Sequence, residues 1–453
     1  MSVRRLFAIW TAKLISTGCK MAGKQGVTLA GKIALKIDPN ILHDLALQVR
    51  EKIFVVCGTN GKTTTNNLLC SAIESEGKKL VCNHTGSNML DGVAAAFVLA
   101  AKNNGKLDAD YACIEIDEAS TVRVFPHFKP DYMVLTNLFR DQLDRYGEID
   151  ITMNLLDRAM KMAPQMEVIV NGDDALSAYL AMESGNRYVT YGIAEQVFET
   201  QESGEIREGR FCKRCGERLE YAFYHYSQLG SYHCPKCGFA RPEADFNAAD
   251  IDRRSGLNFT IQEKKGGRKT AVSVNYQGFY NIYNILAAYS AARSGGLELS
   301  RFQNILDEFN PQNGRMEHFS IDGTDIVLNL AKNPAGFNQN ISAVMEDTKE
   351  KDVIIVINDN AQDGTDISWL WDVDFDRLQD PSVRSITVSG IRCQDMRLRM
   401  KYVDIPCELE GDVETAIRKR IADGCGNLYV LVNYTALFST RNILAKAQEG
   451  ARS

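Results

Sequence analysis

The first chemical signal in this chain lies within residues 53–65, where an apolar run ends in the turn Gly58-Thr59-Asn60-Gly61-Lys62-Thr63. Glycines let backbone N–H groups approach an anion, a lysine ammonium can span two phosphates, and a threonine hydroxyl can ligate Mg²⁺ where a helix begins. The first glycine of the general phosphate-loop pattern is missing, because Val56 stands five residues before Gly61. The shorter motif still predicts ATP binding, with Thr64 as a further contact.

Two Cys-x2-Cys pairs form the second signal, Cys212 with Cys215 and Cys234 with Cys237, and eighteen residues separate the pairs. Four thiolates in two knuckles at this separation suit tetrahedral Zn²⁺. Because four cysteines complete the coordination, we expect a closed structural site without zinc catalysis. A redox dithiol is the alternative.

The elements that must position these groups begin at residue 52, where short apolar runs start to alternate with helix-length segments. This alternation predicts βαβ units and a mostly parallel sheet, in which ligands bind at the carboxyl ends of the strands. The phosphate turn, Glu115 and Asn137 all lie at or near such ends, so we expect them to converge. The predicted strands are 52–57, 79–82, 111–116, 131–137 and 167–170.

The second half of the chain predicts a smaller α/β domain. A turn rich in Pro, Asn and Gly at 310–315 marks its start. We expect a lead segment at 1–50, an ATP-binding domain at 51–312 with the cysteine-rich insertion at about 205–243, and a C-terminal domain at 313–453. Further predicted elements are strands at 257–261, 270–274, 326–330, 353–357, 385–388 and 428–432, and a helix at 285–292.

Composition indicates a soluble protein, since 45% of the 453 residues are hydrophobic, 24% are charged and the formal net charge is -6. Such a charge gives no general attraction to nucleic acid, so we expect no nucleic-acid partner. Near the N-terminus, the spacing of Val3, Leu6, Phe7, Trp10 and Leu14 predicts an amphipathic helix that is too short and too charged to cross a bilayer.

This first helix has two interpretations. Packing of its apolar side on its own domain is the more common arrangement, and contact with a membrane surface is the alternative. We expect a cytoplasmic protein. If the helix contacts a membrane, we expect a peripheral position at the inner face of the plasma membrane.

Several motifs, in the order in which they occur along the chain, resemble the Mur ligases of peptidoglycan synthesis. They are the phosphate turn, Glu115 after a strand, Thr136-Asn137 with Asp141 and Asp144, Asn281 and Asn284 before a helix, Gly314-Arg315-Met316-Glu317, and Asn333-Pro334. The four cysteines and the segment Asp363-Gly364-Thr365-Asp366-Ile367-Ser368-Trp369-Leu370-Trp371-Asp372 resemble one branch specifically. That branch is the MurT family, the ligase-like subunits of lipid II isoglutaminyl synthase.

The resemblance implies ATP-dependent amidation of the α-carboxyl of D-glutamate in the lipid II stem peptide, through an acyl phosphate, with ammonia from a separate glutaminase subunit, GatD. It implies that Lys62 acts on the phosphates and that Thr63 and Glu115 hold Mg²⁺. Asn281, Asn284 and Arg315 would contact the nucleotide, and Arg315 could instead contact the transferred phosphate. Asp366 would orient the histidine of the partner's Cys-His pair.

Each assignment has a simpler alternative. The magnesium role of Glu115 could belong to Asp117 or Glu118. Asn281 and Asn284 could be helix caps, and Arg315 could pair with Glu317. Asp366 could cap a helix starting near Ser368, in which case Asp363 or Asp372 would be the residue presented to the partner.

The chain also departs from the amino-acid-adding Mur ligases, in which a histidine and a carbamoylated lysine concern a second metal. Gln142 stands in place of the histidine, no lysine occurs within 149–158, and Lys161 lies too far along. A ligase that adds an amino acid to a peptide or folate carboxylate remains an alternative function. A nucleic-acid-binding zinc-ribbon NTPase is a weaker one, because Glu208, Glu217 and Glu220 dilute the basic residues of the insertion.

Overall fold

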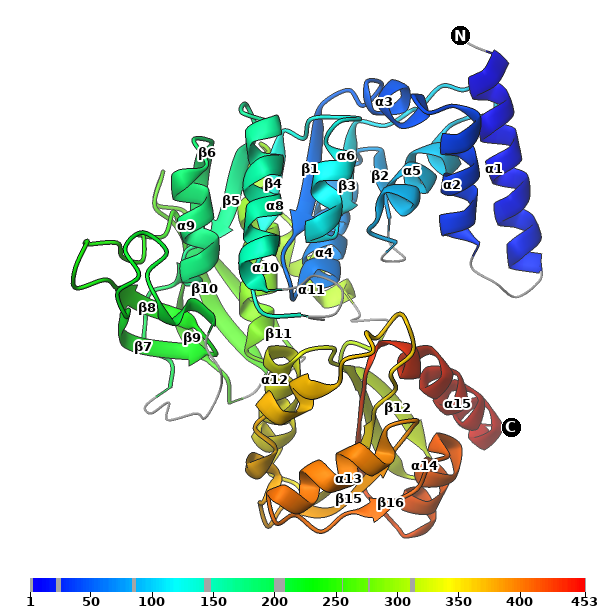
Figure 1. Cartoon of the computed structure of the whole chain (residues 1–453), viewed down its shortest axis with the longest axis vertical. Coiled ribbons are helices and arrows are strands. Elements are labelled where there is room, and N and C mark those ends of the chain that lie inside the picture. Colours follow the sequence, from blue (N-terminus) through cyan, green and yellow to red (C-terminus); the bar gives the residue numbers. More distant parts are fainter. Residues whose placement is uncertain are drawn as a thin grey trace.

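The computed structural model describes residues 3–21, 26–83, 87–141, 148–198, 208–254, 256–275, 278–309 and 314–452. Two α/β units, each built on its own sheet, lie one above the other in Figure 1, and a small two-stranded sheet stands at the side of the larger unit. This architecture confirms the predicted fold class.

The larger sheet has nine strands. Neighbours from β2 to β9 run parallel, whereas β9, β10 and β11 are antiparallel. In sheet order the strands are β11 (Lys269–Val274), β10 (Leu257–Glu263), β9 (Phe246–Asp252), β6 (Arg187–Ile193), β5 (Glu167–Asn171), β4 (Tyr132–Leu135), β1 (Lys52–Cys57), β3 (Tyr111–Glu115) and β2 (Leu80–Cys82).

Both faces of this sheet are buried. Along β1, Phe54 and Val56 enter one core while Val55 and Cys57 enter the other, as the two-residue period of a strand requires. A strand buried on both faces reads as a continuous apolar run, which is why β1 was predictable from sequence. One face carries α4 (Lys62–Ser75), α10 (Tyr280–Ser294) and α11 (Phe302–Glu308). The other carries α5 (Leu90–Ala100), η1 (Glu118–Ser120), α6 (Thr121–Val124), α8 (Ile149–Met162) and α9 (Ala175–Glu183).

The N-terminal helices α1 (Val3–Met21) and α2 (Val27–Ile37) pack together, with α2 against α5, and α3 (Ile41–Ala46) leads to β1. The predicted amphipathic helix is present as α1, but it does not pack its predicted apolar side on its own domain. Its buried side consists of small residues and Ile9, whereas Phe7 and Leu14 are 58% and 73% exposed. Ile9 and small residues therefore hold α1 to the protein, whereas Phe7 and Leu14 point to solvent.

The smaller sheet has six strands, parallel except for the antiparallel pair β12 and β13. Its order is β12 (Glu317–Ile321), β13 (Thr324–Leu330), β17 (Asn427–Val432), β14 (Lys351–Val356), β15 (Val383–Ser389) and β16 (Glu408–Leu409). Its helices are α12 (Pro334–Glu346), η3 (Ser368–Asp372), η4 (Phe375–Leu378), α13 (Cys393–Tyr402), α14 (Val413–Ala422) and α15 (Tyr434–Arg452).

The cysteine-rich insertion forms η2 (Glu208–Arg210) and the hairpin of β7 (Glu220–Tyr226) and β8 (Leu229–His233) between β6 and β9. The strands β6 and β9 were not predicted, because polar residues interrupt their apolar pattern. The predicted helix at 285–292 begins earlier, at Tyr280, since the buried asparagines of α10 hide its first turns. Most of the predicted 310–315 turn lies outside the described residues.

Two helical glycines give a matched test of how tightly the N-terminal helices are packed. A Cβ on Gly31 would lie 1.8 Å from the carbonyl oxygen of Asp91 in α5, whereas nothing lies within 4 Å of a Cβ on Gly18. We expect Gly31→Ala to lower the free energy of unfolding by about 1–3 kcal/mol. Gly18→Ala should raise it by up to about 1 kcal/mol, because alanine favours a helix. Chemical denaturation measures both, and equal effects would contradict this packing.

Candidate functional site

The phosphate turn joins β1 to α4 in a conformation that only glycine accommodates easily. Gly58 has φ 118° and Gly61 has φ 85°. Space is also limiting, because a Cβ on Gly58 would lie 2.2 Å from Thr136 Oγ1 and one on Gly61 would lie 2.1 Å from Asn284 Oδ1. The turn is therefore enclosed by the end of β4 on one side and by α10 on the other.

Backbone contacts from the residues after β4 fix the shape of this turn. The N–H of Thr59 donates to the carbonyl oxygen of Asn137 at 2.8 Å, and the N–H of Asn60 donates to Asn137 Oδ1 at 2.9 Å. The Thr59 hydroxyl donates to the carbonyl of Phe139 at 3.1 Å. Thr64 follows, buried in the first turn of α4. One asparagine thus sets two successive residues of the candidate phosphate site.

Lys62 turns back onto the turn that it follows. Its ammonium donates to the carbonyl oxygens of Gly58 and Thr59, and it pairs with Glu118 Oε1 at 3.1 Å. Burial alone would lower the pKa of Lys62, but Glu118 and neighbouring carboxylates outweigh burial and raise that pKa. The ammonium therefore stays charged in a desolvated position beside the turn, as phosphate binding requires.

The structure brings Glu115 and Thr63 together, as the sequence analysis predicted for a magnesium site. The Thr63 hydroxyl donates to Glu115 Oε2 at 2.8 Å, and Asn88 Nδ2 donates to Oε1 at 3.0 Å. Hydroxyl and carboxylate oxygens suit Mg²⁺, so the residues present fit that ion. The two alternatives have other partners, since Asp117 accepts from the N–H of Ala119 in η1 and Glu118 pairs with Lys62.

The two asparagines of α10 lie beside the turn and do not cap the helix. The cap residue is Phe279, without a side-chain hydrogen bond. Asn281 and Asn284 are each 5% exposed, and Asn284 Nδ2 donates to Asn281 Oδ1 at 3.1 Å. Because Asn284 Oδ1 abuts Gly61, this pair can reach a nucleotide held by the turn.

Arg315 does not form the predicted alternative pair with Glu317 in the described parts of the chain. Glu317 accepts instead from Arg441 Nε at 2.8 Å and from the N–H of Gly314 at 3.0 Å. The charge of Arg315 acts on Tyr280 at the start of α10, where burial raises the pKa of the tyrosine and Arg315 opposes that rise. Arg315 is therefore near the helix that carries the two asparagines.

Contacts between the two α/β units meet beside the phosphate turn. Asn60 and Asn333 exchange side-chain amide hydrogen bonds of 3.3 and 3.1 Å. Asn333 also caps α12 by accepting from the N–H of Gly336 at 2.8 Å, so the positive end of this helix dipole lies near the turn. Asn60 and Asn333 lie 273 residues apart, and no local signal in the sequence indicates their contact.

A second contact between the units involves Lys332, the residue before Asn333. Its ammonium pairs with Asp141 Oδ2, while Oδ1 of the same carboxylate is buried and has no hydrogen-bond partner among the described residues. Lys332 is also close enough to Glu118 to lower the pKa of that carboxyl, against the larger effect of burial, which raises it. Its side chain therefore links the second unit to the phosphate site.

Asp366 lines a narrow cavity between the two units. The other lining residues are Arg140, Asp141, Lys332, Asn333, Pro334, Ser368 and Trp369. Asp366 is partly exposed, and its Oδ1 accepts from the N–H of Ser368 at 2.8 Å. The alternative was a helix cap, but the cap residue of η3 is Ile367, without a side-chain hydrogen bond. The contact of Asp366 with Ser368 is a local turn that uses one carboxylate oxygen. The segment around Asp366 thus reaches the same cavity as Lys332.

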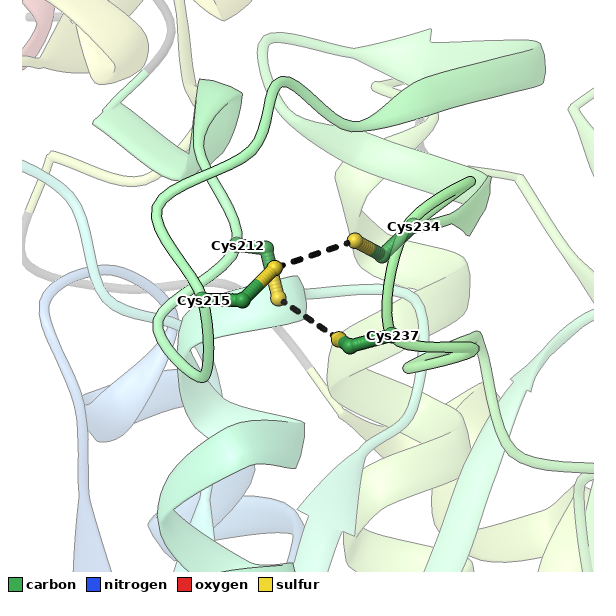
Figure 2. A group of neighbouring side chains, drawn as sticks. All are labelled: Cys212, Cys215, Cys234 and Cys237. Atoms are coloured by element: carbon green, nitrogen blue, oxygen red, sulfur yellow. Dashed lines mark hydrogen bonds between the residues drawn. The ribbon is translucent and has the colours of Figure 1, made fainter.

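The four cysteines converge, with all four sulfur atoms within 4.8 Å of one another (Figure 2). The two knuckles have matching backbone bonds. The N–H of Gly216 donates to the carbonyl oxygen of Cys212 at 2.8 Å, and the N–H of Gly238 donates to the carbonyl oxygen of Cys234 at 3.1 Å. Burial raises the pKa of the Cys234 thiol, but the backbone N–H groups of Cys237 and Lys236 and the thiols of Cys215 and Cys237 together outweigh burial and lower that pKa to about 7. This donor set fits a structural zinc ion.

Cationic side chains of the zinc-site insertion are engaged in ion pairs. Lys213 pairs with Asp150 at 2.5 Å, and Arg214 pairs with Glu183 at 2.8 Å while its guanidinium lies 5.0 Å from the ring centre of Phe239. These contacts dock the insertion onto α8 and α9. They reduce the positive surface that a nucleic-acid interface needs.

Comparison with known proteins identifies the family. The family model "Mur ligase middle domain" matches residues 56–233, and "MurT ligase C-terminal" matches residues 330–437. The MurT subunit of lipid II isoglutaminyl synthase (glutamine-hydrolyzing) from Staphylococcus aureus (strain COL) is 37% identical over 453 residues, which covers 100% of both chains. The corresponding subunit from Streptococcus pneumoniae is 33% identical over 431 residues, covering 94% of this chain and 93% of the relative.

The chain belongs to the MurT family. It is thus an ATP-dependent ligase of the Mur type. Solved structures agree on the fold: a pseudomurein peptide ligase type C from Methanothermus fervidus aligns with TM-score 0.70 and 21% identity, over 89% of this chain and 80% of that one. MurF from Thermotoga maritima, solved in complex with ADP, aligns with TM-score 0.64 and 14% identity, over 94% and 85%.

This MurT-family chain does not place a lysine of α8 in the site. Lys161 lies on the solvent side of α8, where its side chain is 61% exposed and pairs with Asp157 at 2.7 Å. Gln142 and Asp144 lie outside the described residues. The departure at Gln142, which stands where the amino-acid-adding ligases have a histidine, is therefore known from the sequence alone.

The two lysines give a matched test of the phosphate site. We expect Lys62→Met to reduce ATP turnover by about a hundredfold to a thousandfold, because it removes a desolvated charge from the phosphate turn. Lys161→Met should leave turnover unchanged, because its ammonium is at the surface. Release of ADP measures both. Strong loss in the Lys161 variant would indicate a carbamoylated-lysine arrangement like that of the amino-acid-adding ligases.

Removing one thiolate tests the zinc site. We expect Cys212→Ser to weaken zinc affinity by at least about a hundredfold and to lower the thermal unfolding midpoint, because metal binding and folding of the insertion are coupled. Metal analysis and thermal unfolding report the two effects. Cys407→Ser, which changes a cysteine outside the cluster, is the control, and unchanged zinc content in the Cys212 variant would refute the assignment.

Proposed function

We propose that this chain is the synthetase subunit of a lipid II isoglutaminyl synthase, which converts the α-carboxyl of D-glutamate in the lipid II stem peptide to the amide of D-isoglutamine. Full-length identity to subunits with this name supports the substrate class. The structural observation that carries the proposal is the cavity between the units, where Asp366 opens toward Lys332 and Asp141, close to the phosphate turn.

Amidation needs activation because a carboxylate is a poor electrophile. The substrate carboxylate attacks the γ-phosphorus of ATP, the bond to the β-phosphate oxygen breaks, and an acyl phosphate and ADP form. Phosphoryl transfer of this kind depends mainly on positioning and charge neutralisation. Lys62 supplies a fixed ammonium, while Thr63 and Glu115 hold the Mg²⁺ that neutralises phosphate charge. Asn281, Asn284 and Arg315 bind and orient the nucleotide.

Ammonia completes the reaction by attacking the acyl carbon. The new C–N bond forms, inorganic phosphate leaves with the electrons of the C–O bond, and nitrogen loses a proton. We propose that the ammonia comes from glutamine, hydrolysed by a GatD-like glutaminase subunit that forms a heterodimer with this chain. Asp366 orients the histidine of the partner's Cys-His pair, which keeps the thiolate available to attack the glutamine amide.

The neighbouring aspartates have structural contacts that make them less suited to this role. Asp363 is 6% exposed and accepts from both the N–H and the hydroxyl of Thr435 in α15. Asp372 pairs with Arg140 across the units. In the described parts of the chain Asp366 pairs with no cation, so its second carboxylate oxygen can accept from an incoming imidazole.

The reaction consumes ATP, which supports a cytoplasmic location, and a lipid-linked substrate brings the enzyme to the inner face of the plasma membrane. No helix in the described ranges combines the length and apolarity needed to span a bilayer. The acceptor is therefore expected to be met at the membrane surface.

ADP release tests the whole proposal. Turnover should require a lipid II substrate together with ammonia, or together with glutamine when the glutaminase subunit is present. Turnover driven by an amino acid in place of ammonia would favour an amino-acid-adding ligase. Stimulation by nucleic acid would favour a nucleic-acid-binding NTPase.

The role of Asp366 has its own test. We expect Asp366→Asn to reduce glutamine-driven amidation by about a thousandfold or more, because the histidine tautomer is no longer fixed, while ammonia-driven amidation stays near the unmodified level. Asp412→Asn, which changes a cap of α14 in the same unit, is the matched control. Equal loss of both activities in the Asp366 variant would contradict the assignment.

A further inference from the structure

Helix α1 presents a stripe of large apolar side chains to solvent. Val3, Phe7, Trp10, Leu14 and Met21 are 82%, 58%, 49%, 73% and 86% exposed. At 3.6 residues per turn, these five positions fall within an arc of about 60°. An exposed apolar stripe this continuous usually marks a contact surface.

The stripe lies opposite the face by which α1 is attached to the protein. Ala8, Ile9, Ala12 and Ser16 are buried, and the centre of this set is about 180° around the helix from the exposed stripe. The helix is already packed through Ile9 and small residues. The large apolar residues of the exposed stripe are therefore left available for a second partner.

The charged residues of α1 and α2 are all basic. The first 37 residues contain seven lysines and arginines and no aspartate or glutamate, in a chain whose formal net charge is -6. Arg5 pairs with Asp44, and Lys13 donates to the carbonyl of Ala101. The exposed cationic residues described on α1 and α2 are Arg4, Lys20, Lys32 and Lys36, and Arg4 Nε also donates to the carbonyl oxygen of Ile37.

We propose that α1 and α2 dock the enzyme on an anionic phospholipid bilayer, with the apolar stripe in the interfacial region and the exposed cations at the headgroups. A helix with an apolar face flanked by Lys and Arg binds such surfaces through burial and charge together. Trp10 suits the interface, because its ring is apolar while its Nε1 donates to the carbonyl of Asn103 at 2.9 Å.

This docking connects to the catalytic site through α5. The helix α2 packs closely on α5, which begins at Leu90, two residues after the Asn88 that contacts Glu115. In Figure 1 the α1–α2 pair lies on the side of the sheet that ends with β2, at the far end from the zinc-site insertion. The inference rests on the proposed function for its physiological purpose, because that function has a membrane-bound acceptor.

Vesicle binding of the full chain tests the proposal. We expect binding to vesicles of phosphatidylcholine with phosphatidylglycerol, weaker binding to phosphatidylcholine alone, and weakening by salt. The double variant Phe7→Ser with Leu14→Ser should reduce affinity for the mixed vesicles by about tenfold or more. Ile151→Ser, at a 51% exposed position of α8, is the matched control and should bind as the unmodified chain does.

Three outcomes would overturn the proposal. The first is equal vesicle binding by both variants and the unmodified chain, and the second is binding that does not depend on lipid charge. The third is an α1 variant that still binds vesicles but has lost self-association or binding to the glutaminase subunit. Ammonia-driven amidation separates this inference from the proposed function. The α1 variant should amidate detergent-dispersed lipid II normally and vesicle-embedded lipid II slowly. If the unmodified enzyme amidates neither substrate, the proposed function fails. Co-sedimentation of the chain with the vesicles still decides whether α1 and α2 bind the membrane.

Discussion

Lys62 is 6% exposed, and the structure around its ammonium has to supply oxygen partners that water no longer provides. An unpaired buried charge costs several kcal/mol, so a lysine in this position needs carbonyl oxygens, a carboxylate or a phosphate. The turn provides the carbonyls and Glu118 provides the carboxylate. The same requirement explains why the helix start, the ends of β3 and β4, and α10 all crowd around so short a turn.

The zinc-site insertion takes part in this arrangement even though its metal site is separate. Gln228 in its hairpin donates to the carbonyl of Leu138 and to Asp174 Oδ1, both at 2.7 Å, and the N–H of Leu138 donates to Asp174 Oδ2 at 2.8 Å. Leu138 follows Asn137, the residue that fixes the phosphate turn. A buried, fully paired polar network of this kind is rigid, so the insertion supports the nucleotide site from behind.

What could be predicted from the sequence was local. The buried strand β1, the phosphate turn and the cysteine pairs each have a signal within a few residues, and the structure contains all three. Pairings between distant residues have no such signal, which is why Lys332 with Asp141 was missed. The apolar period of α1 was visible, but a period cannot say which face meets the protein. Small residues such as Ala8 can pack more closely than Phe7, and this decided the orientation.

The paired amides of Asn60 and Asn333 give the two units a joint without net charge. Hydrogen bonds between neutral groups that water can replace contribute only about 0.5–1.5 kcal/mol each, so the amide pair adds little to the attraction between the units. The ion pairs Lys332 with Asp141 and Arg140 with Asp372 act over a longer range, whereas the amides contribute only when they are in register. The cap of α12 therefore adds precision at the phosphate turn to a junction whose attraction comes mainly from charge.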